Sequence, residues 1–227
     1  MSDGTGGSGA PRFGSEPGRT VLDPARRAAL ADEVRASLEA ACPGSRARLR
    51  GSLAAGTADP YSDIDVEWTV PAGRFRECVE GTRAALERVG ALMSLRSDPD
   101  LAAAAGQRLL FAAFSGQPLF WRLDLEVHAE PPGAAGVPDP GATDPWSPAA
   151  SALANAVAAV KALRRDRPDL ALCLLERALT RVGSPARPTT RWSADIQVLA
   201  EAATASDPAQ RPLAEAVLTL ADEYLPN

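Results

Sequence analysis

The stretch RGSLAAGTADPYSDIDVEW, residues 50–68, is the most informative segment of this chain for predicting its fold. It begins at the end of a short alternating segment, RARLR at 46–50, with Gly51 and Ser52 directly after it. It runs into SDIDVEWTV at 62–70, where acidic residues alternate with apolar ones. Because successive side chains of a strand point to opposite faces, these alternations predict two strands, the second with an acidic face.

The Gly-Ser pair and the acidic face together predict a site for a polyphosphate and its metal ions. A glycine at position 51 lets the backbone approach phosphate closely, and the Ser52 hydroxyl can donate a hydrogen bond to a phosphate oxygen. Asp63 and Asp65 are two residues apart on a strand, so their carboxylates share a face, roughly 6–7 Å apart along the backbone. Because carboxylate oxygens suit hard cations, we expect this pair to bind Mg²⁺.

A site that holds two metal ions usually needs a third carboxylate. Asp124 and Glu126 lie on one face of LFWRLDLEVHA at 119–129. This segment is predicted to form a hairpin with RLLFAAF at 108–114, and we expect antiparallel pairing to bring it beside the strand of the two aspartates. Asp124 is preferred because its short side chain suits a fixed ligand in a strand, and Glu126 stays open as the alternative.

The remaining patterns predict an α+β domain followed by a C-terminal α-helical bundle. A helix is expected to start after Asp23, which precedes a proline, and to run to about Ala41. Another helix is predicted at about 72–89 and a strand at 91–95, ahead of the hairpin. After Pro148 the periodicity predicts helices alone, at 149–166, 169–182, 193–204 and 208–224.

Composition divides the chain into four parts. Residues 1–19 are rich in Gly, Ser and Pro, which predicts a disordered tail. Residues 20–130 carry a mixed strand and helix pattern and are predicted to form one domain. Residues 131–146 contain five prolines and three glycines and predict a linker. Residues 147–227 form the predicted helical accessory domain.

The bulk composition limits the classes of partner. The 24 basic and 29 acidic residues leave a net charge of −5, which argues against nucleic-acid binding and favours a small substrate. The N-terminus has no leader pattern and the apolar run at 149–160 is too short to span a bilayer, so we expect a cytoplasmic protein without membrane association. Cys42, Cys78 and Cys173 have no paired spacing, so we expect small buried residues and neither a zinc site nor a disulfide.

The order of Gly-Ser, a loop, Asp-x-Asp on a strand and a later third carboxylate resembles the signature of the polymerase-β-like nucleotidyltransferase superfamily. Gly56 and the segment YSDID at 61–65 resemble its small bacterial members. These are the aminoglycoside-type nucleotidyltransferases and the minimal nucleotidyltransferases of toxin–antitoxin operons. The resemblance covers residues 20–130 and implies the nucleotidyltransferase fold, a small mixed sheet with flanking helices. The C-terminal helices resemble, in pattern, the accessory domain of antibiotic-modifying members.

The resemblance implies a metal-dependent nucleotidyltransferase. Two Mg²⁺ ions held by Asp63, Asp65 and Asp124 would orient a nucleoside triphosphate that rests on Gly51 and Ser52. A hydroxyl of a small acceptor would then attack the α-phosphorus and release pyrophosphate. The expected reaction is transfer of AMP from ATP to a hydroxylated small molecule such as an aminoglycoside-like antibiotic or natural product.

Several roles stay open at this point. Relatives commonly use a lysine of the first C-terminal helix on the triphosphate, which implies this role for Lys161; a lysine that covers apolar surface is an equal alternative. Arg122 lies two residues before Asp124 on the same face, where a solvated strand edge is expected and contact with phosphate is the alternative. Relatives also commonly dimerise, which adds a homodimer to the expectations. The alternative function is a minimal nucleotidyltransferase antitoxin acting on a partner protein, for which the roughly eighty C-terminal residues make the chain long.

Overall fold

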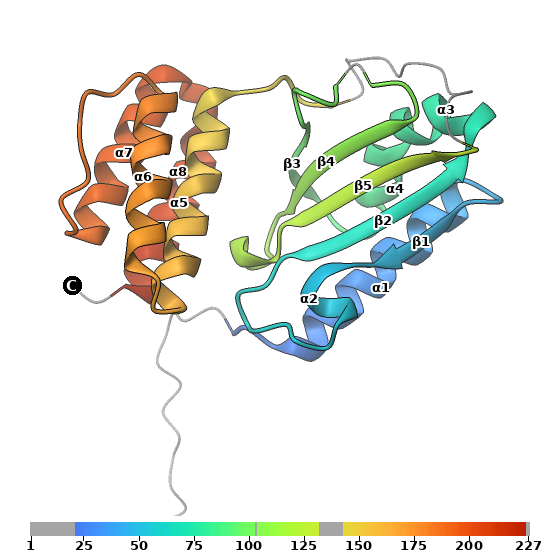
Figure 1. Ribbon diagram of the computed structural model, residues 1–227, viewed down its shortest axis with the longest axis horizontal. Coiled ribbons are helices and arrows are strands. Elements are labelled where there is room, and N and C mark those ends of the chain that lie inside the picture. Colours follow the sequence, from blue (N-terminus) through green and yellow to red (C-terminus); the bar gives the residue numbers. More distant parts are fainter. Residues whose placement is uncertain (1–20, 103, 132–142, 226–227) are drawn as a thin grey trace, which may run out of the picture.

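The computed structural model describes residues 21–102, 104–131 and 143–225, which combine a β-sheet with helices (Figure 1). The predicted tail at 1–19 lies outside the described residues, as do residues 132–142 of the predicted linker. Within the described ranges the protein is of the α+β class, with a five-stranded mixed sheet and eight α-helices.

Strands and helices are mixed in the first part of the chain, and helices alone make up the second. The strands are β1 (Arg46–Leu49), β2 (Ile64–Pro71), β3 (Leu92–Ser97), β4 (Gln107–Phe114) and β5 (Leu123–Glu130). The helices are α1 (Pro24–Ala41), α2 (Gly51–Ala54), α3 (Phe75–Glu80), α4 (Thr82–Glu87), α5 (Pro148–Arg164), α6 (Pro168–Arg181), α7 (Trp192–Ser206) and α8 (Arg211–Tyr224). Short 3₁₀ helices η1 (Ala72–Arg74), η2 (Leu119–Trp121) and η4 (Pro208–Gln210) join some of them.

The sheet has the strand order β1-β2-β5-β4-β3. The central pair, β2 and β5, is parallel, and the other neighbours are antiparallel. The predicted hairpin of β4 and β5 is confirmed, but the expected antiparallel approach of β5 to the strand of Asp65 is wrong. The crossover through α3 and α4 starts β3 in the direction of β2, and two reversals at β4 and β5 restore that direction.

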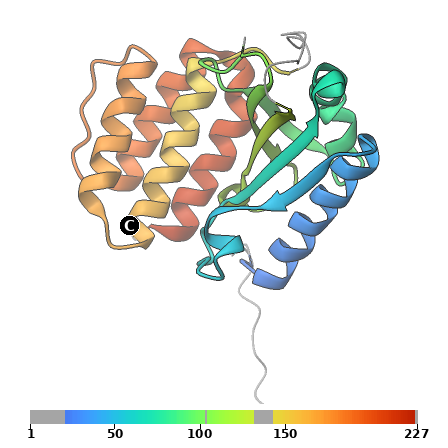
Figure 2. The same ribbon diagram turned by 45° about the vertical axis from the view of Figure 1, so that its right-hand side comes forward.

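Helices α1, α3 and α4 cover one face of the sheet (Figures 1 and 2). Along β2 the apolar residues Ile64, Val66 and Trp68 are fully buried against this layer, and the intervening acids are half-buried on the other face. The predicted alternation of β2 is therefore confirmed. At the start of α1 the Asp23 carboxylate accepts a hydrogen bond from the Ala25 amide at 2.9 Å, as an N-cap does.

Two predicted elements differ in detail. The helix expected at 72–89 consists of η1, α3 and α4, which are separated at Gly81. Glycine disfavours the helical backbone, and Gly73 weakens the first turn in the same way. The hairpin arm expected from residue 119 begins as the 3₁₀ turn η2, and β5 starts at Leu123.

The expected burial of the cysteines is confirmed for Cys42 and Cys78, but the expectation that they form no disulfide is wrong. Cys42 at the end of α1 and Cys78 in α3 form a disulfide with a Cα separation of 6.1 Å, and both are buried. They are 36 residues apart, so the sequence spacing carries no signal; the packing of both helices on one sheet face brings them together. Cys173, expected to be buried, lies on the exposed side of α6.

Helices α5 to α8 form the predicted helical bundle, with α5 in contact with the other three. The bundle stands beside the sheet (Figure 2). Tyr61, Phe120 and Tyr224 link the two parts through edge-to-face contacts, with ring centroids 5.0 to 6.1 Å apart. Among the described residues, no helix has the length and apolar composition needed to cross a membrane.

Candidate functional site

Three carboxylates meet where the two central strands begin. Asp63 directly precedes β2, Asp65 is the second residue of β2, and Asp124 is the second residue of β5. The register of the parallel pair makes Asp65 and Asp124 direct neighbours. Glu126 lies one step further along the same face, beside Glu67. The structure thus brings together the three aspartates named from the sequence.

The predicted Gly-Ser turn is the first turn of the short helix α2. Gly51 has a positive φ of 55°, and a Cβ atom on it would lie 3.0 Å from Cγ of Asp65 and closer still to one carboxylate oxygen. The amide of Arg50 donates to the Asp65 carbonyl at 2.9 Å. Only glycine allows this backbone to touch the Asp65 carboxylate without strain.

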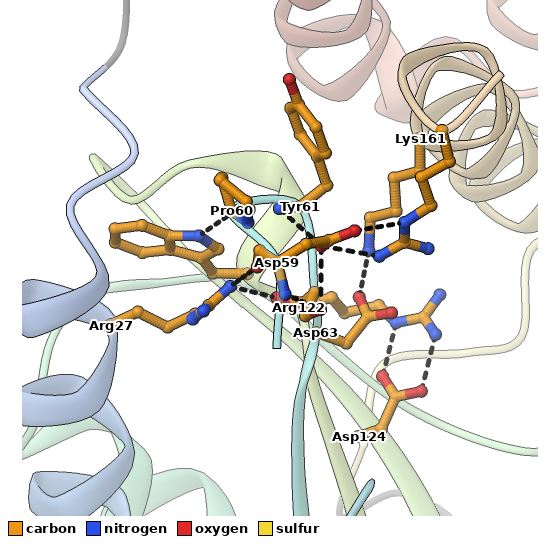
Figure 3. A network of polar contacts seen from close by, with 11 residues as sticks. Arg27, Asp59, Pro60, Tyr61, Asp63, Arg122, Asp124 and Lys161 are labelled. Atoms are coloured by element: carbon orange, nitrogen blue, oxygen red, sulfur yellow. Dashed lines mark hydrogen bonds and ion pairs between the residues drawn. The ribbon is translucent and has the colours of Figure 1, made fainter. Parts of the chain in front are cut away.

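The loop between α2 and β2 is fixed from both sides (Figure 3). Arg165, at the end of α5, donates to both oxygens of the Asp59 carboxylate at 2.6 and 2.9 Å. Arg27 of α1 donates to the carbonyls of Asp59 at 2.5 Å and Ser62 at 3.2 Å. The Arg165 hydrogen bonds lower the pKa of Asp59 to about 2. Sequence reasoning did not single out these three charged residues, because their partners are distant in the chain.

Lys161 reaches the carboxylates from the helical bundle. Its Nζ forms an ion pair with Oδ1 of Asp63, and the lysine is 7% exposed (Figure 3). Burial lowers the pKa of Lys161, and the charge of Asp63 opposes this shift. The structure therefore favours a place at the site over the alternative of a lysine covering apolar surface.

Arg122 is bound to the third aspartate. Its Nε and Nη2 donate to the two oxygens of Asp124 at 2.6 and 2.7 Å. Burial acts against the charge of Arg122, but the hydrogen bonds and charge of Asp124 raise its pKa. The expectation of a solvated edge residue is wrong, because the bundle covers this end of the sheet and Asp124 shares its face. The signal available in the sequence was the spacing of two between Arg122 and Asp124.

The negative charges of Asp63, Asp65 and Asp124 lie close together and repel one another. Burial raises the pKa of Asp65, and the charges of Asp124 and Asp63 add to this effect. Burial also raises the pKa of Asp124, although Arg122 acts to lower it. These three half-buried carboxylates offer oxygen ligands to a hard cation, and binding of such a cation would relieve the repulsion. The residues present therefore fit Mg²⁺ chemically.

The ligand atoms that converge most tightly in the described part of the chain belong to a different group. Glu67, Glu126 and His128 have ligand atoms within 4.8 Å of one another. Arg50 forms ion pairs with both glutamates, and His128 Nε2 lies 3.2 Å from Glu126. Asp63, Asp65 and Asp124 do not converge this closely. Lys161 pairs with Asp63, and Arg122 pairs with Asp124. The contacts of Glu126 lie within this second group.

Comparisons with known proteins leave the family of this chain open. No family model matches the sequence, and no curated protein matches it. Among solved structures, the chain is similar to one described as the polymerase core of TRAMP, an RNA surveillance complex, with 14% sequence identity and a TM-score of 0.36. The match covers 86% of this chain and 56% of that one. A TM-score of this size does not show a shared fold, so a function has to be inferred from the site.

Proposed function

We propose that this chain has a nucleotidyltransferase fold and transfers a nucleoside monophosphate from a nucleoside triphosphate to a hydroxyl of a small molecule. The observation that carries the proposal is the pairing of Asp65 and Asp124 on adjacent parallel strands, with Gly51 in contact with Asp65. Asp63, directly before β2, completes a set of three carboxylates that can supply oxygen ligands. Such a set beside a glycine turn suits a triphosphate and its metal ions.

The triphosphate is assigned to the side of Gly51 and Ser52. The first turn of a helix has amide groups without partners inside the helix, and these can donate to phosphate oxygens. The absence of a side chain at Gly51 makes room for the Asp65 carboxylate beside this turn, and the Ser52 hydroxyl adds a donor. Lys161 brings a buried positive charge to the same carboxylates and can form a charge-assisted hydrogen bond to a phosphate oxygen.

Asp63, Asp65 and Asp124 are proposed to hold two Mg²⁺ ions. When bound, Mg²⁺ neutralises charge on the phosphates and makes the acceptor hydroxyl more acidic. The carboxylates fix the positions of donor and acceptor, which lowers the entropy cost of bringing the reacting atoms together. The ion pairs of Lys161 with Asp63 and of Arg165 with Asp59 attach the bundle to the loop before β2 and keep this loop in place during the step.

Asp124 is proposed to accept the proton of the acceptor hydroxyl. Its raised pKa makes it a better base than an ordinary aspartate. The hydroxyl oxygen forms a bond to the α-phosphorus, the bond from that phosphorus to the bridging oxygen breaks, and pyrophosphate leaves. Glu126, the alternative base, lies one step further along β5, beside Glu67 and not beside Asp65, which favours Asp124.

The finer predictions from the sequence stay predictions: AMP as the transferred group, an aminoglycoside-like acceptor, a homodimer, no nucleic-acid partner and a cytoplasmic location. The antitoxin alternative is likewise untested.

The test is release of pyrophosphate by the purified chain with Mg²⁺, each of the four nucleoside triphosphates and a panel of hydroxylated acceptors. The panel holds aminoglycosides, neutral sugars, hydroxy acids and sugar phosphates. We expect release with at least one combination and a loss of about 10²- to 10⁴-fold in Asp63→Asn. Asp32→Asn makes the same chemical change at an exposed position of α1 and serves as the control. Absence of release in every combination, or full activity of Asp63→Asn, contradicts the proposal.

A further inference from the structure

A cavity of about 90 Å³ lies between the sheet and α5, next to the aspartates. Its polar lining includes Arg96 of β3, Arg122 and Lys161, and its apolar lining includes Phe111 of β4 and Ala154 of α5. Its volume holds several water molecules and therefore a carboxylate- or phosphate-sized group. Three of the lining side chains carry a positive charge.

The strand order places this cavity on the acceptor side of the site. In the order β1-β2-β5-β4-β3, the Gly51 turn follows β1 and lies on one flank of Asp65 and Asp124. Arg96 and Phe111 belong to β3 and β4, on the other flank. A triphosphate that rests on Gly51 leaves this second flank to the acceptor.

Arg96 is a buried cation whose guanidinium group has no ion-pair partner among the described residues. It is 7% exposed, and its guanidinium carbon lies 5.5 Å from the ring centroids of both Phe111 and Trp146. Burial and the nearby charge of Arg122 lower the pKa of Arg96 to about 10, so the group stays charged at neutral pH. Stacking on two rings offsets part of the desolvation cost but leaves the donors available to a ligand.

The position of Arg96 is fixed by the segment that leads into α5. The amide of Asp144 donates to the Leu95 carbonyl at 2.7 Å, and the Leu95 amide donates to the Asp144 carboxylate at 2.9 Å. These contacts hold the segment along β3, so that Trp146 lies over Arg96. The Asp144 carboxylate forms its ion pair with Arg83 and not with Arg96.

The charges around the cavity do not balance. Asp63 pairs with Lys161 and Asp124 pairs with Arg122, so each of these carboxylates has its own cation. Asp65 adds a third carboxylate nearby but does not line the cavity, and the charges of Asp124 and Asp144 act on Arg96 without forming an ion pair with it. Arg96 is therefore a lining cation without an ion pair of its own among the described residues. Burial of such a charge is unfavourable, and a bound anion would offset this cost.

We infer that the cavity binds an anionic group of the acceptor, a carboxylate or a phosphate, through the guanidinium of Arg96. The inference rests on the proposed function and names the class of its second substrate: a hydroxylated small molecule that carries negative charge. The acceptor hydroxyl then lies toward Asp124 while its anionic group contacts Arg96. This differs from the cationic aminoglycoside-like acceptor expected from the sequence, since the local charge of the cavity is positive although the chain as a whole is acidic.

The experiment is calorimetric titration of the full chain with Mg²⁺ and a saturating non-hydrolysable triphosphate analogue, which occupies the phosphate side. Gluconate and glucose 6-phosphate supply the carboxylate and the phosphate, glucose is the neutral probe, and an aminoglycoside is the cationic one. We expect at least one anionic probe to bind more tightly than glucose. Arg96→Gln should weaken that binding by roughly 10- to 100-fold, the value of a charge-assisted hydrogen bond.

Two further variants make the result specific. Arg96→Lys keeps the charge and should retain part of the affinity, whereas the exposed Arg76→Gln on α3 should bind like the wild type. Thermal melting by circular dichroism checks that each variant is folded. An anion affinity unchanged in folded Arg96→Gln overturns the inference, as does preference of the wild type for glucose or the aminoglycoside.

The binding assay needs no turnover, so it separates the two proposals. Arg96-dependent anion binding without pyrophosphate release from any combination of substrates would leave the anion site standing and remove the proposed function. Nucleotidyl transfer to neutral or cationic acceptors, unaffected by Arg96→Gln, would do the reverse.

Discussion

Replacement of Gly51 by alanine perturbs the contact between the glycine turn and the metal-binding carboxylates. Two costs follow from the structure. The positive φ of 55° puts alanine in the left-handed region, at roughly 1–2 kcal/mol. The new Cβ would lie 3.0 Å from Cγ of Asp65, well inside the contact distance of about 3.5–4.0 Å. The carboxylate therefore has to move by on the order of 1 Å, which is worth about 100-fold in rate when it misplaces a catalytic group.

Gly56→Ala is the matched control for this prediction. Gly56 has a φ of 68°, and a Cβ atom on it would meet nothing within 4 Å. Both variants share the cost of the positive φ, seen as a melting temperature lower by roughly 2–8 °C, and Gly51→Ala should lose more because Asp65 also has to move. Only Gly51→Ala should lose about 100-fold in the rate of pyrophosphate release. Equal rates for the two variants would refute the reasoning that Gly51 is needed for its contact with Asp65.

Two predictions concern charge. The Arg165 hydrogen bonds lower the pKa of Asp59 to about 2, so the difference in melting temperature between wild type and Asp59→Asn should be full above pH 5 and shrink as the pH falls from about 4 to 2; a constant difference over this range contradicts it. Burial and the neighbouring aspartates raise the pKa of Asp65, so Asp65→Asn should be inactive yet melt above the wild type in Mg²⁺-free buffer at pH 8. This gain in melting temperature should shrink as the pH is lowered, because Asp65 of the wild type then takes up a proton. Added Mg²⁺ should stabilise the wild type alone. Equal stabilisation of both proteins by Mg²⁺ would show that Asp65 is not a ligand.

Local patterns predicted the elements that a single period determines. The alternation of Ile64, Val66 and Trp68 predicts β2, and these three side chains form part of the core. The four C-terminal helices follow from apolar periodicity and from their helix-start residues, and their observed bounds differ by at most three residues from those predicted. The prediction of one continuous helix at 72–89 is wrong, because the helix is interrupted at Gly81. The prediction followed the apolar periodicity and gave too little weight to this glycine.

Contacts between distant segments were beyond such patterns. Cys42 and Cys78 meet because α1 and α3 share one face of the sheet, and no spacing in the sequence reports this. The same holds for the clamp on Asp59, which joins it to Arg165 of α5 across 106 residues. Arg96 could not be recognised as a cavity cation either, because its burial depends on α5 and on Trp146.

The residues of the candidate site could be named from the sequence pattern alone. They are Gly51 and Ser52 after one strand, and Asp63, Asp65 and Asp124 at the start of two others. Strand period and glycine geometry act over a few residues, so a linear pattern is sufficient to reveal them. The tertiary structure decided the parallel register that sets Asp65 beside Asp124, and the counter-ions that surround them. Electrostatic partners are set by distance in space: packing of the bundle on the sheet brings Lys161 to Asp63, and the strand order places Arg96 of β3 on the flank of the aspartates.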